Sequence, residues 1–351
     1  MTWRGVFDGR SWLQAPRTLS ALLPTGTLVL ETLVTASPDG PVTLIDHHRR
    51  DGWDRALSLS VDPGGRITLS DRQGPAHVRA HLDAPLTEED GCLRIYYTWN
   101  APARRGALAV ELPDTGRWRR VPVHAPHPLP EDDLAMLAQS LGPRVLDAGT
   151  GFLAWSDTVE PVGPMPGLGE GTVIDTANGP RQVQTLTPGD LVRTAADGFL
   201  PVRHVLTREV PAAARLAPVL LAAPALGLAA DVLVAPGHRM RIEGADAEYL
   251  FSEDAVLVEA RHLVPIAAVP QGHRRATQRY HQVVLDRHAC IAICGSWGES
   301  QFLPAPVTQM AERIGTILAP LPPNSVPHHE SHATPLLRPY EAAVLVAAIG
   351  A

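Results

Sequence analysis

The chain has 351 residues, of which 45% are hydrophobic and 19% are charged, and its formal net charge is −7. This composition is typical of a globular protein and excludes general disorder. Without a basic arm, the sequence gives no electrostatic support for a nucleic-acid partner. At roughly 100–200 residues per domain, the length suffices for two domains.

The three cysteines, Cys92, Cys290 and Cys294, are too few for a disulfide framework or a tetrahedral zinc site. We therefore expect no metal and no cofactor, and we assign the cysteines to the core. The first residues lack the apolar stretch of a signal peptide, and the apolar segment 216–228 is too short to span a bilayer. We expect a soluble protein, either cytoplasmic or secreted by a route that needs no signal peptide.

Short strands dominate residues 1–157, which we expect to form a β-sandwich. Within residues 55–73, apolar residues alternate with polar ones on both sides of Asp62-Pro63-Gly64-Gly65, which predicts a hairpin. Acidic residues open the segment 131–142 and a glycine ends it, which predicts a helix. Further strands are predicted at residues 27–36, 42–48, 93–99, 107–112, 117–123 and 151–156.

Prolines and glycines crowd residues 158–170, which we interpret as a linker between two domains. The next region, residues 171–304, is again rich in strand patterns, and it includes a hairpin that turns at Asn178-Gly179. The tail, residues 305–351, is predicted to hold helices over 307–318 and 339–349.

Four ordered blocks stand out within residues 167–303. They read GLGEGTVIDTANGPRQVQTLTPGDLVRT, DVLVAPGHRM, EYLFSEDAVLVEARHLV and YHQVVLDRHACIAICGSWGESQF. Together they resemble the Hint module that hedgehog autoprocessing proteins share with inteins, and they are closest in form to the bacterial stand-alone Hint proteins. The resemblance implies an all-β horseshoe. We therefore expect the whole chain to be all-β, with a sandwich, a Hint-type domain and short C-terminal helices.

Self-cleavage in this family needs a nucleophile at the first residue of the module and a histidine, from a Thr-x-x-His block, that contacts the scissile nitrogen. By the resemblance, these positions fall on Gly167 for the nucleophile, Ala235 for the threonine and His238 for the histidine. Glycine cannot attack a carbonyl, and Thr172 would be a poor substitute. The resemblance therefore implies a catalytically degenerate module.

Three side chains remain candidates for acid–base catalysis, namely His238, Asp286 and His288; His281 is a weaker candidate. Each also has a structural interpretation. His238 follows a Pro-Gly turn and is expected to bond to the backbone. Asp286 stands at a strand end, where aspartate commonly satisfies the amides of a turn.

Residues 20–157 resemble the concanavalin-A-like, laminin-G-type sandwiches through the segment CLRIYYTWNAPARRGALAVEL. By this resemblance, the domain would bind glycans or proteins, in some cases with calcium. Exposed tryptophans stack on sugars, whereas Trp99 and Trp155 are assigned to the core. The segment Asp46-His47-His48 is expected in a solvated turn rather than in a ligand set.

The histidine-rich segment 327–332 lacks the His-Glu-x-x-His spacing of a zinc protease, and we interpret it as an exposed polar loop. Three functions stay open. The first is a Hint domain-containing protein without self-cleavage that binds a protein or glycan ligand or serves as a structural part. The second is a self-processing enzyme that uses His238 and an unidentified nucleophile. The third is a secreted or surface component that binds glycans.

Overall fold

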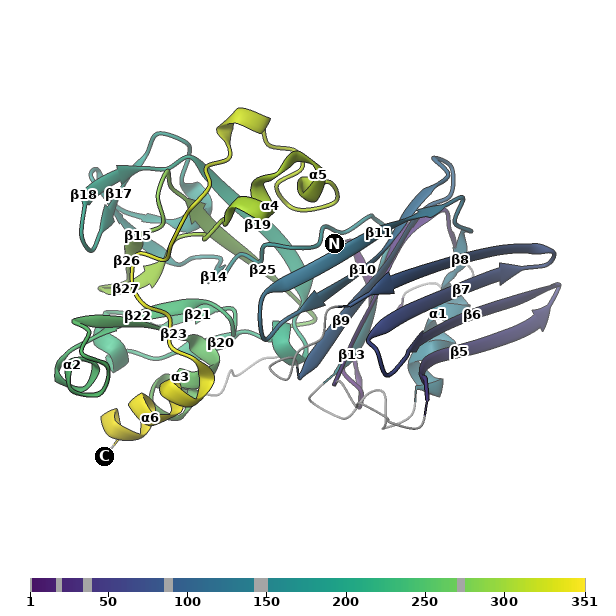
Figure 1. Cartoon of the computed structure of the whole chain (residues 1–351), viewed down its shortest axis with the longest axis horizontal. Coiled ribbons are helices and arrows are strands. Elements are labelled where there is room, and N and C mark those ends of the chain that lie inside the picture. Colours follow the sequence, from purple (N-terminus) through teal and green to yellow (C-terminus); the bar gives the residue numbers. More distant parts are fainter. Residues whose placement is uncertain are drawn as a thin grey trace. The chain divides into compact units, whose positions relative to one another are not determined.

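The computed structural model describes residues 2–16, 21–33, 40–84, 91–141, 151–269 and 275–350. The chain divides into two compact units (Figure 1). The first comprises residues 1–163 with 213–215 and 275–277, and the second comprises the remainder. Both are built mainly of antiparallel strands, which confirms the predicted fold class. No helix in the described part of the chain is both long and apolar enough to cross a membrane.

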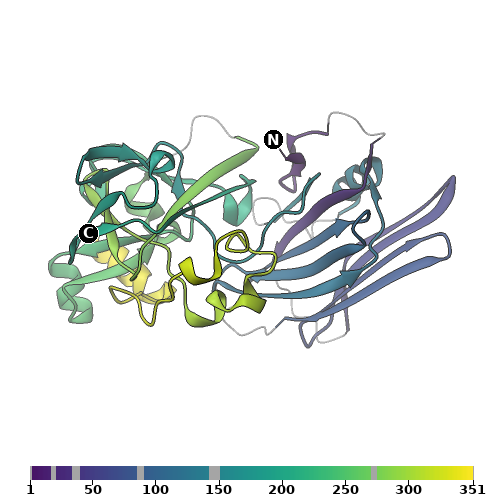
Figure 2. The same ribbon diagram turned by 90° about the horizontal axis from the view of Figure 1, so that it is seen from above.

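Two sheets form the first unit, and Figure 2 shows them from above. The larger sheet has the order β11-β10-β9-β4-β13-β1-β2, and the smaller one is the meander β5-β6-β7-β8. Two short strands, β3 (Leu22–Leu23) and β12 (Leu129–Pro130), pair separately. The bounds are β1 (Trp3–Phe7), β2 (Trp12–Gln14), β4 (Thr25–Leu33), β5 (Val42–Asp51), β6 (Trp53–Val61), β7 (Arg66–Gln73), β8 (Ala76–Asp83), β9 (Cys92–Asn100), β10 (Arg105–Leu112), β11 (Arg117–His124) and β13 (Phe152–Ser156).

The alternating pattern of β6 and β7 places their leucines and isoleucine in the sandwich core. The predicted hairpin is confirmed, because Val61 pairs with Ile67 across the turn and Gly65 adopts the positive φ of 83° that the turn requires. Trp99 and Trp155 are both 0% exposed, which confirms their assignment to the core.

Polar side chains replace apolar ones at one end of the inner face of the small sheet, where helix α1 (Glu131–Ser140) packs. The solvated turn expected at Asp46-His47-His48 is wrong, since these residues lie inside β5. The strand alternation continues to Asp51 although the apolar residues end earlier. As a result, His47 faces Asp133 at 3.5 Å, and His48 contacts Asp54 at 2.6 Å.

The second unit also contains two sheets. One has the order β19-β25-β14-β21-β20-β24, and the other has the order β16-β15-β17-β26-β27-β22-β23, with β18 paired to β17. The predicted hairpin at Asn178-Gly179 is β15–β16. The bounds are β14 (Leu168–Gly169), β15 (Val173–Thr176), β16 (Gly179–Gln182), β17 (Leu191–Thr194), β18 (Gly198–Pro201), β19 (His204–Pro211), β20 (Val219–Leu221), β21 (Val232–Val234), β22 (Arg239–Glu243), β23 (Ala255–Glu259), β24 (Ala268–Val269), β25 (Thr277–Val284), β26 (Cys290–Ile293) and β27 (Ser296–Glu299).

The helices of the second unit are α2 (Ala245–Phe251), α3 (Ala260–Ala267), α4 (Ala305–Thr308), α5 (Met310–Arg313) and α6 (Pro339–Ile349). The terminal helix agrees with its predicted bounds. The single helix predicted over 307–318 is wrong, because Gln309 has extended backbone angles (φ −65°, ψ 139°) that separate α4 from α5.

Candidate functional site

Gly167 lies where the chain enters the second unit, directly before the short strand β14. Because β14 pairs with β21 on one side and β25 on the other, Gly167 comes close to residues of both neighbours. Its carbonyl accepts a hydrogen bond from the Ala235 amide at 2.8 Å, and its amide donates to the Gln282 side-chain oxygen at 3.2 Å. The fold thus brings together the two positions, Gly167 and Ala235, that the sequence resemblance linked.

His238 completes this group and is only 3% exposed. Its amide donates to the Ala235 carbonyl at 2.9 Å, and its carbonyl accepts from the Ala260 amide at 2.8 Å. A Cβ atom placed on Gly167 would lie 2.4 Å from Nδ1 of His238 and 2.8 Å from its Cγ. Real Cβ atoms do not approach other atoms this closely, so any side chain at position 167 requires the imidazole to move.

A second glycine lies against the opposite side of the same ring. A Cβ atom on Gly298 would come within 2.8 Å of Nε2 of His238. Among the described residues, this nitrogen has no hydrogen-bond partner. Burial, with a smaller effect of Arg239, lowers the pKa of His238 to about 4, although Glu299 opposes the shift. The imidazole is therefore neutral at pH 7 and fits closely between two glycines.

Gln282 holds the backbone amide of Gly167 in place. Its side-chain nitrogen donates to the Glu299 carbonyl at 2.6 Å, which leaves its oxygen to accept from the Gly167 amide. Sequence analysis did not select Gln282 or Glu299, although both lie in the last of the four blocks. The available signal for Gln282 was a polar residue directly before Val283 and Val284 in a buried strand.

The thiols and hydroxyls of this region that could replace a missing nucleophile are bonded elsewhere. The hydroxyl of Thr172 donates to the Gly169 carbonyl at 2.7 Å. The sulfur of Cys294 lies 3.7 Å from the Val173 carbonyl, and that of Cys290 lies 3.8 Å from the Thr334 hydroxyl. Burial raises the pKa of both thiols, so both stay protonated and poorly nucleophilic at neutral pH.

The other acid–base candidates do not join His238. Asp286 is 55% exposed and pairs with Arg203. His288 is buried, and its Nδ1 accepts the Ala333 amide at 2.9 Å. The weaker candidate His281 contacts the Thr207 hydroxyl through Nδ1 at 3.0 Å. The acidic group that acts electrostatically on His238 is therefore Glu299 and not Asp286.

One set of side chains in this unit, His288, Glu299 and His332, has the donor types of a metal site, with one ligand atom from each within 4.8 Å of the others. Nε2 of His288 lies 3.4 Å from the Glu299 carboxylate. To coordinate a metal ion through Nε2, His288 must carry its proton on Nδ1. Nδ1 instead accepts a hydrogen bond from the Ala333 amide, so the proton of the neutral ring is on Nε2. Arg239 also contacts the same carboxylate at 3.2 Å. In this arrangement, the three residues do not fit a metal ion.

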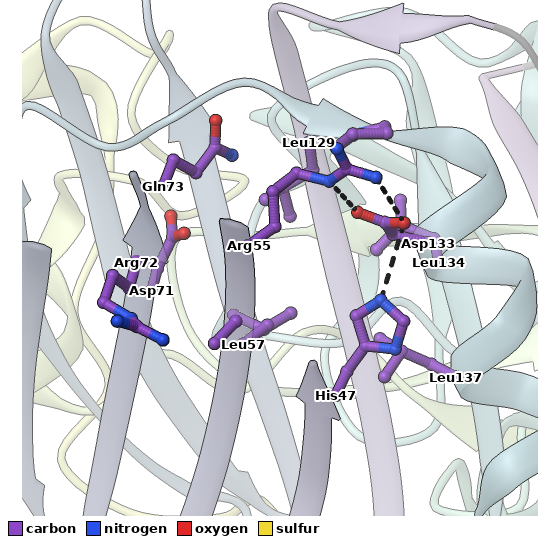
Figure 3. A pocket seen from close by; sticks show the side chains of 12 residues that line it. His47, Arg55, Leu57, Asp71, Arg72, Gln73, Leu129, Asp133, Leu134 and Leu137 are labelled. Atoms are coloured by element: carbon purple, nitrogen blue, oxygen red, sulfur yellow. Dashed lines mark hydrogen bonds and ion pairs between the residues drawn. The ribbon is translucent and has the colours of Figure 1, made fainter. Parts of the chain in front are cut away.

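The first unit has a hollow at the polar end of its small sheet, lined in part by His47, Arg55, Asp71 and Asp133 (Figure 3). Its volume of about 20 Å³ is large enough for one water molecule. Arg55 donates two hydrogen bonds to Asp133, at 2.7 and 3.2 Å. Burial raises the pKa of Asp133, but hydrogen bonds from His47 and Arg55 outweigh this effect and hold it well below its usual range.

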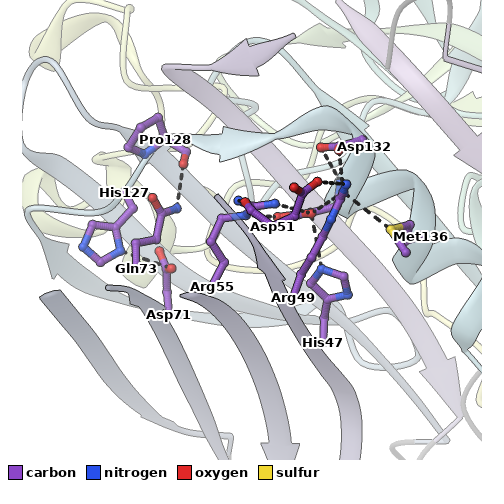
Figure 4. Close-up of polar contacts among 11 residues, drawn as sticks. His47, Arg49, Asp51, Arg55, Asp71, Gln73, His127, Pro128, Asp132 and Met136 are labelled. Atoms are coloured by element: carbon purple, nitrogen blue, oxygen red, sulfur yellow. Dashed lines mark hydrogen bonds and ion pairs between the residues drawn. The ribbon is translucent and has the colours of Figure 1, made fainter. Parts of the chain in front are cut away.

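Polar and charged side chains around this hollow also connect helix α1 and the segment before it to the small sheet. Arg49 contacts Asp132 and Asp133 of the helix, and Gln73 donates to the Pro128 carbonyl at 2.8 Å (Figure 4). Because these groups bond to one another, they stabilise the packing of the helix and leave little for a ligand. Trp53 is 49% exposed, and the Arg55 guanidinium lies 4.5 Å from the centre of its ring.

Comparisons with known proteins identify the second unit. No curated protein matches the chain. Among solved structures, tailspike protein 2 of an Escherichia coli O157:H7 bacteriophage is 15% identical, with a TM-score of 0.23 over 38% of this chain and 17% of the tailspike. The LG1–3 region of the laminin α2 chain is 14% identical, with a TM-score of 0.25 over 85% of this chain and 56% of that one. Domains LG4–5 of mouse laminin α1 are 10% identical, with a TM-score of 0.23 over 86% and 75%.

The chain thus spans about a sixth of the tailspike and about half of the laminin α2 fragment. The family comparison concerns the region around Gly167 and His238 directly, because residues 166–305 match the model described as the Hint domain. The chain is a Hint domain-containing protein, and its match begins one residue before Gly167.

Proposed function

We propose that the Hint domain does not cleave the chain and that the protein works as a binding or structural module. The observation that carries this proposal is the position of the His238 ring, which fills the space that a side chain at position 167 would occupy. Two obstacles therefore oppose self-cleavage. Gly167 carries no nucleophile, and the His238 ring leaves no room for one at this position.

Self-cleavage would begin when a sulfur or oxygen atom at position 167 attacked the carbonyl carbon of Pro166. A new C–S or C–O bond would form, the bond between that carbon and the Gly167 nitrogen would break, and this nitrogen would gain a proton. Glycine supplies no such atom. His238 is neutral at pH 7, so its imidazole could accept or donate a proton. Position 167 offers no nucleophile whose proton it could take.

The test is intact-mass analysis of the purified chain after incubation with a strong thiol. We expect a single species at the full mass of 37.6 kDa. A fragment that begins at Gly167 would contradict the proposal. The double variant Gly167→Cys/Ala235→Thr restores both missing groups, and Gly167→Ala/Ala235→Thr is its control without a thiol. Thiol-dependent cleavage of the cysteine variant alone would attribute the inactivity of the natural chain to these positions.

For the partner, we propose a protein rather than a glycan. The hollow in the sandwich has room for one water molecule but not for a sugar ring, and its charged groups are already paired. The half-exposed Trp53 is the group that favours the alternative, because aromatic rings stack on sugars. A glycan array with the natural chain and with Trp53→Ala separates the two. Sugar binding that disappears in the variant would contradict a protein partner.

A further inference from the structure

The segment 327–337, which we call the strap, runs along the second unit outside the residues that match the Hint family. It was predicted as an exposed polar loop, but His329 is 4% exposed. At its far end, the Leu257 amide donates to the Pro335 carbonyl at 2.7 Å, and the Leu337 amide donates to the Leu257 carbonyl at 3.0 Å. The strap therefore pairs with the outer edge of strand β23, the last strand of its sheet.

Two imidazoles fasten the rest of the strap, and each does so as a hydrogen-bond acceptor. Nδ1 of His288 accepts the Ala333 amide of the strap at 2.9 Å. Nδ1 of His329, in the strap, accepts the Leu303 amide at 3.1 Å, and its Nε2 contacts the Leu285 carbonyl at 3.1 Å. A neutral imidazole has one donor and one acceptor, whereas a protonated one has two donors. Protonation of either ring therefore replaces an attractive contact by two opposed N–H groups.

The surroundings of His329 disfavour added positive charge, because other imidazoles lie around it. The ring centre of His288 lies 5.2 Å from that of His332 and 6.1 Å from that of His329. Glu299, which lies 3.4 Å from Nε2 of His288, is the anion on this side, but it is already paired with Arg239. Around His329, the charged and titratable groups include His288, His328, His332 and Asp286. Phe302 closes the cluster and stacks on His332 at 3.9 Å.

The direction of the titration follows from burial. Burial, as the largest effect, lowers the pKa of His329, and it lowers that of His332 to about 4. A histidine whose folded-state pKa is lowered contributes its full stability above its unfolded pKa. That contribution is lost as the pH falls from about 6.5 toward the folded-state value.

We propose that the strap is a pH-sensitive latch, fastened at neutral pH by His288 and His329 as acceptors and released in mild acid when His329 gains a proton. The latch is independent of self-cleavage, since it uses neither Gly167 nor His238. Its release would free the edge of β23 and uncover the cluster of His288, Glu299 and Phe302.

The test is hydrogen exchange of the full-length variant His238→Asn at pH 7.5 and 5.0, corrected for intrinsic rates. Because position 238 cannot titrate in this variant, strand β26 serves as the internal reference for the strap. We expect exchange at Ala333 and Leu303 to rise at least about tenfold at pH 5.0, because each pH unit below an unfolded pKa of about 6.5 changes the equilibrium about tenfold. Equal protection at both pH values, or a rise of the same size in β26, would overturn the latch.

A variant attributes the effect to His329. His329→Asn keeps an oxygen near the position of Nδ1 that accepts an amide at every pH. We expect it to remove most of the acid-induced rise. His328→Asn is the matched control, because His328 is exposed in the same strap. An unchanged rise in His329→Asn, or its loss in the control, would contradict the assignment.

A protease gives a second readout that needs no variant. Glu330 lies between His329 and His332 and is exposed, as is Glu253 in the loop after α2. The ratio of glutamyl-endopeptidase cleavage at Glu330 to cleavage at Glu253 corrects for the pH dependence of the protease. We expect this ratio to rise about tenfold or more between pH 7.5 and 5.0. A constant ratio would overturn the proposal even if the variants failed to fold.

Discussion

In the first unit, the β-sandwich, buried charged groups pair with groups of opposite charge. In the second unit, buried imidazoles contact glycines, backbone amides and one another. Arg55 and Asp133 are 7% and 10% exposed and share two hydrogen bonds. His238 is 3% exposed, and its Nε2 has no hydrogen-bond partner among the described residues. Carboxylates in such ion pairs stay ionised in mild acid, whereas neutral buried histidines gain a proton there. The stability of the two units should therefore differ in its dependence on pH and in its response to the removal of one member of an ion pair.

The largest expected effect breaks the paired charges of the sandwich. Arg55→Met removes the guanidinium and leaves Asp133 buried without its main partner. We expect the free energy of unfolding of the first unit to fall by about 3–5 kcal/mol. Arg72→Met is the matched control on the neighbouring strand. Its pair with Asp54 is 43% and 31% exposed, so the loss should stay below about 1 kcal/mol. Urea denaturation measures both, and equal losses would contradict the comparison.

A slightly smaller effect separates the units by pH. The pKa of His238 falls from 6.5 to about 4 in the folded chain, so its contribution is complete above pH 6.5 and declines as the pH falls toward 4. At 1.36 kcal/mol for each pKa unit, the second unit should lose up to about 3 kcal/mol over this range. The first unit should lose less, since Asp133 stays ionised there.

Hydrogen exchange of β26 and β9, one strand from each unit, measures this difference in a single sample. The variant His238→Asn cannot titrate and should flatten the response of β26 alone. Parallel losses in both strands would show that the acid response does not originate at His238.

The smallest effect concerns the two glycines that enclose His238. Gly298→Ala places a methyl group 2.8 Å from Nε2 and should cost roughly 1–3 kcal/mol of stability. Gly237→Ala is the control, because a Cβ atom there meets no atom within 4 Å. In the background His238→Ala, the cost of Gly298→Ala should largely disappear, which a double-mutant cycle measures. A cost that persists would assign the crowding to Ile293 instead.

The sequence pattern predicted the elements whose residues are close along the chain. The hairpins β6–β7 and β15–β16 follow from alternation and turn residues, and α6 follows from its apolar run and its proline. The proximity of Gly167, Ala235 and His238 came from a family resemblance and not from periodicity. Gln282 was missed because its role depends on a contact 115 residues away, with the Gly167 amide.

The strap was missed for the same reason. The segment His328-His329-Glu330-Ser331-His332 has the polar composition of an exposed loop. Its burial depends on bonds between ring nitrogens and backbone amides that lie 26 to 45 residues apart in the sequence. Backbone partners carry no residue identity, so no motif in the sequence announces them.

The most direct test of the central claim is the mass of the freshly purified full chain after brief treatment with hydroxylamine at neutral pH. This reagent cleaves thioesters and activated esters there but spares the Asn178-Gly179 bond, which it cuts in alkali. A chain with no nucleophile at position 167 should show one mass of 37.6 kDa with and without the reagent. Two products, one ending at Pro166 and the other beginning at Gly167, would show that the Hint domain forms an activated ester and is catalytically alive.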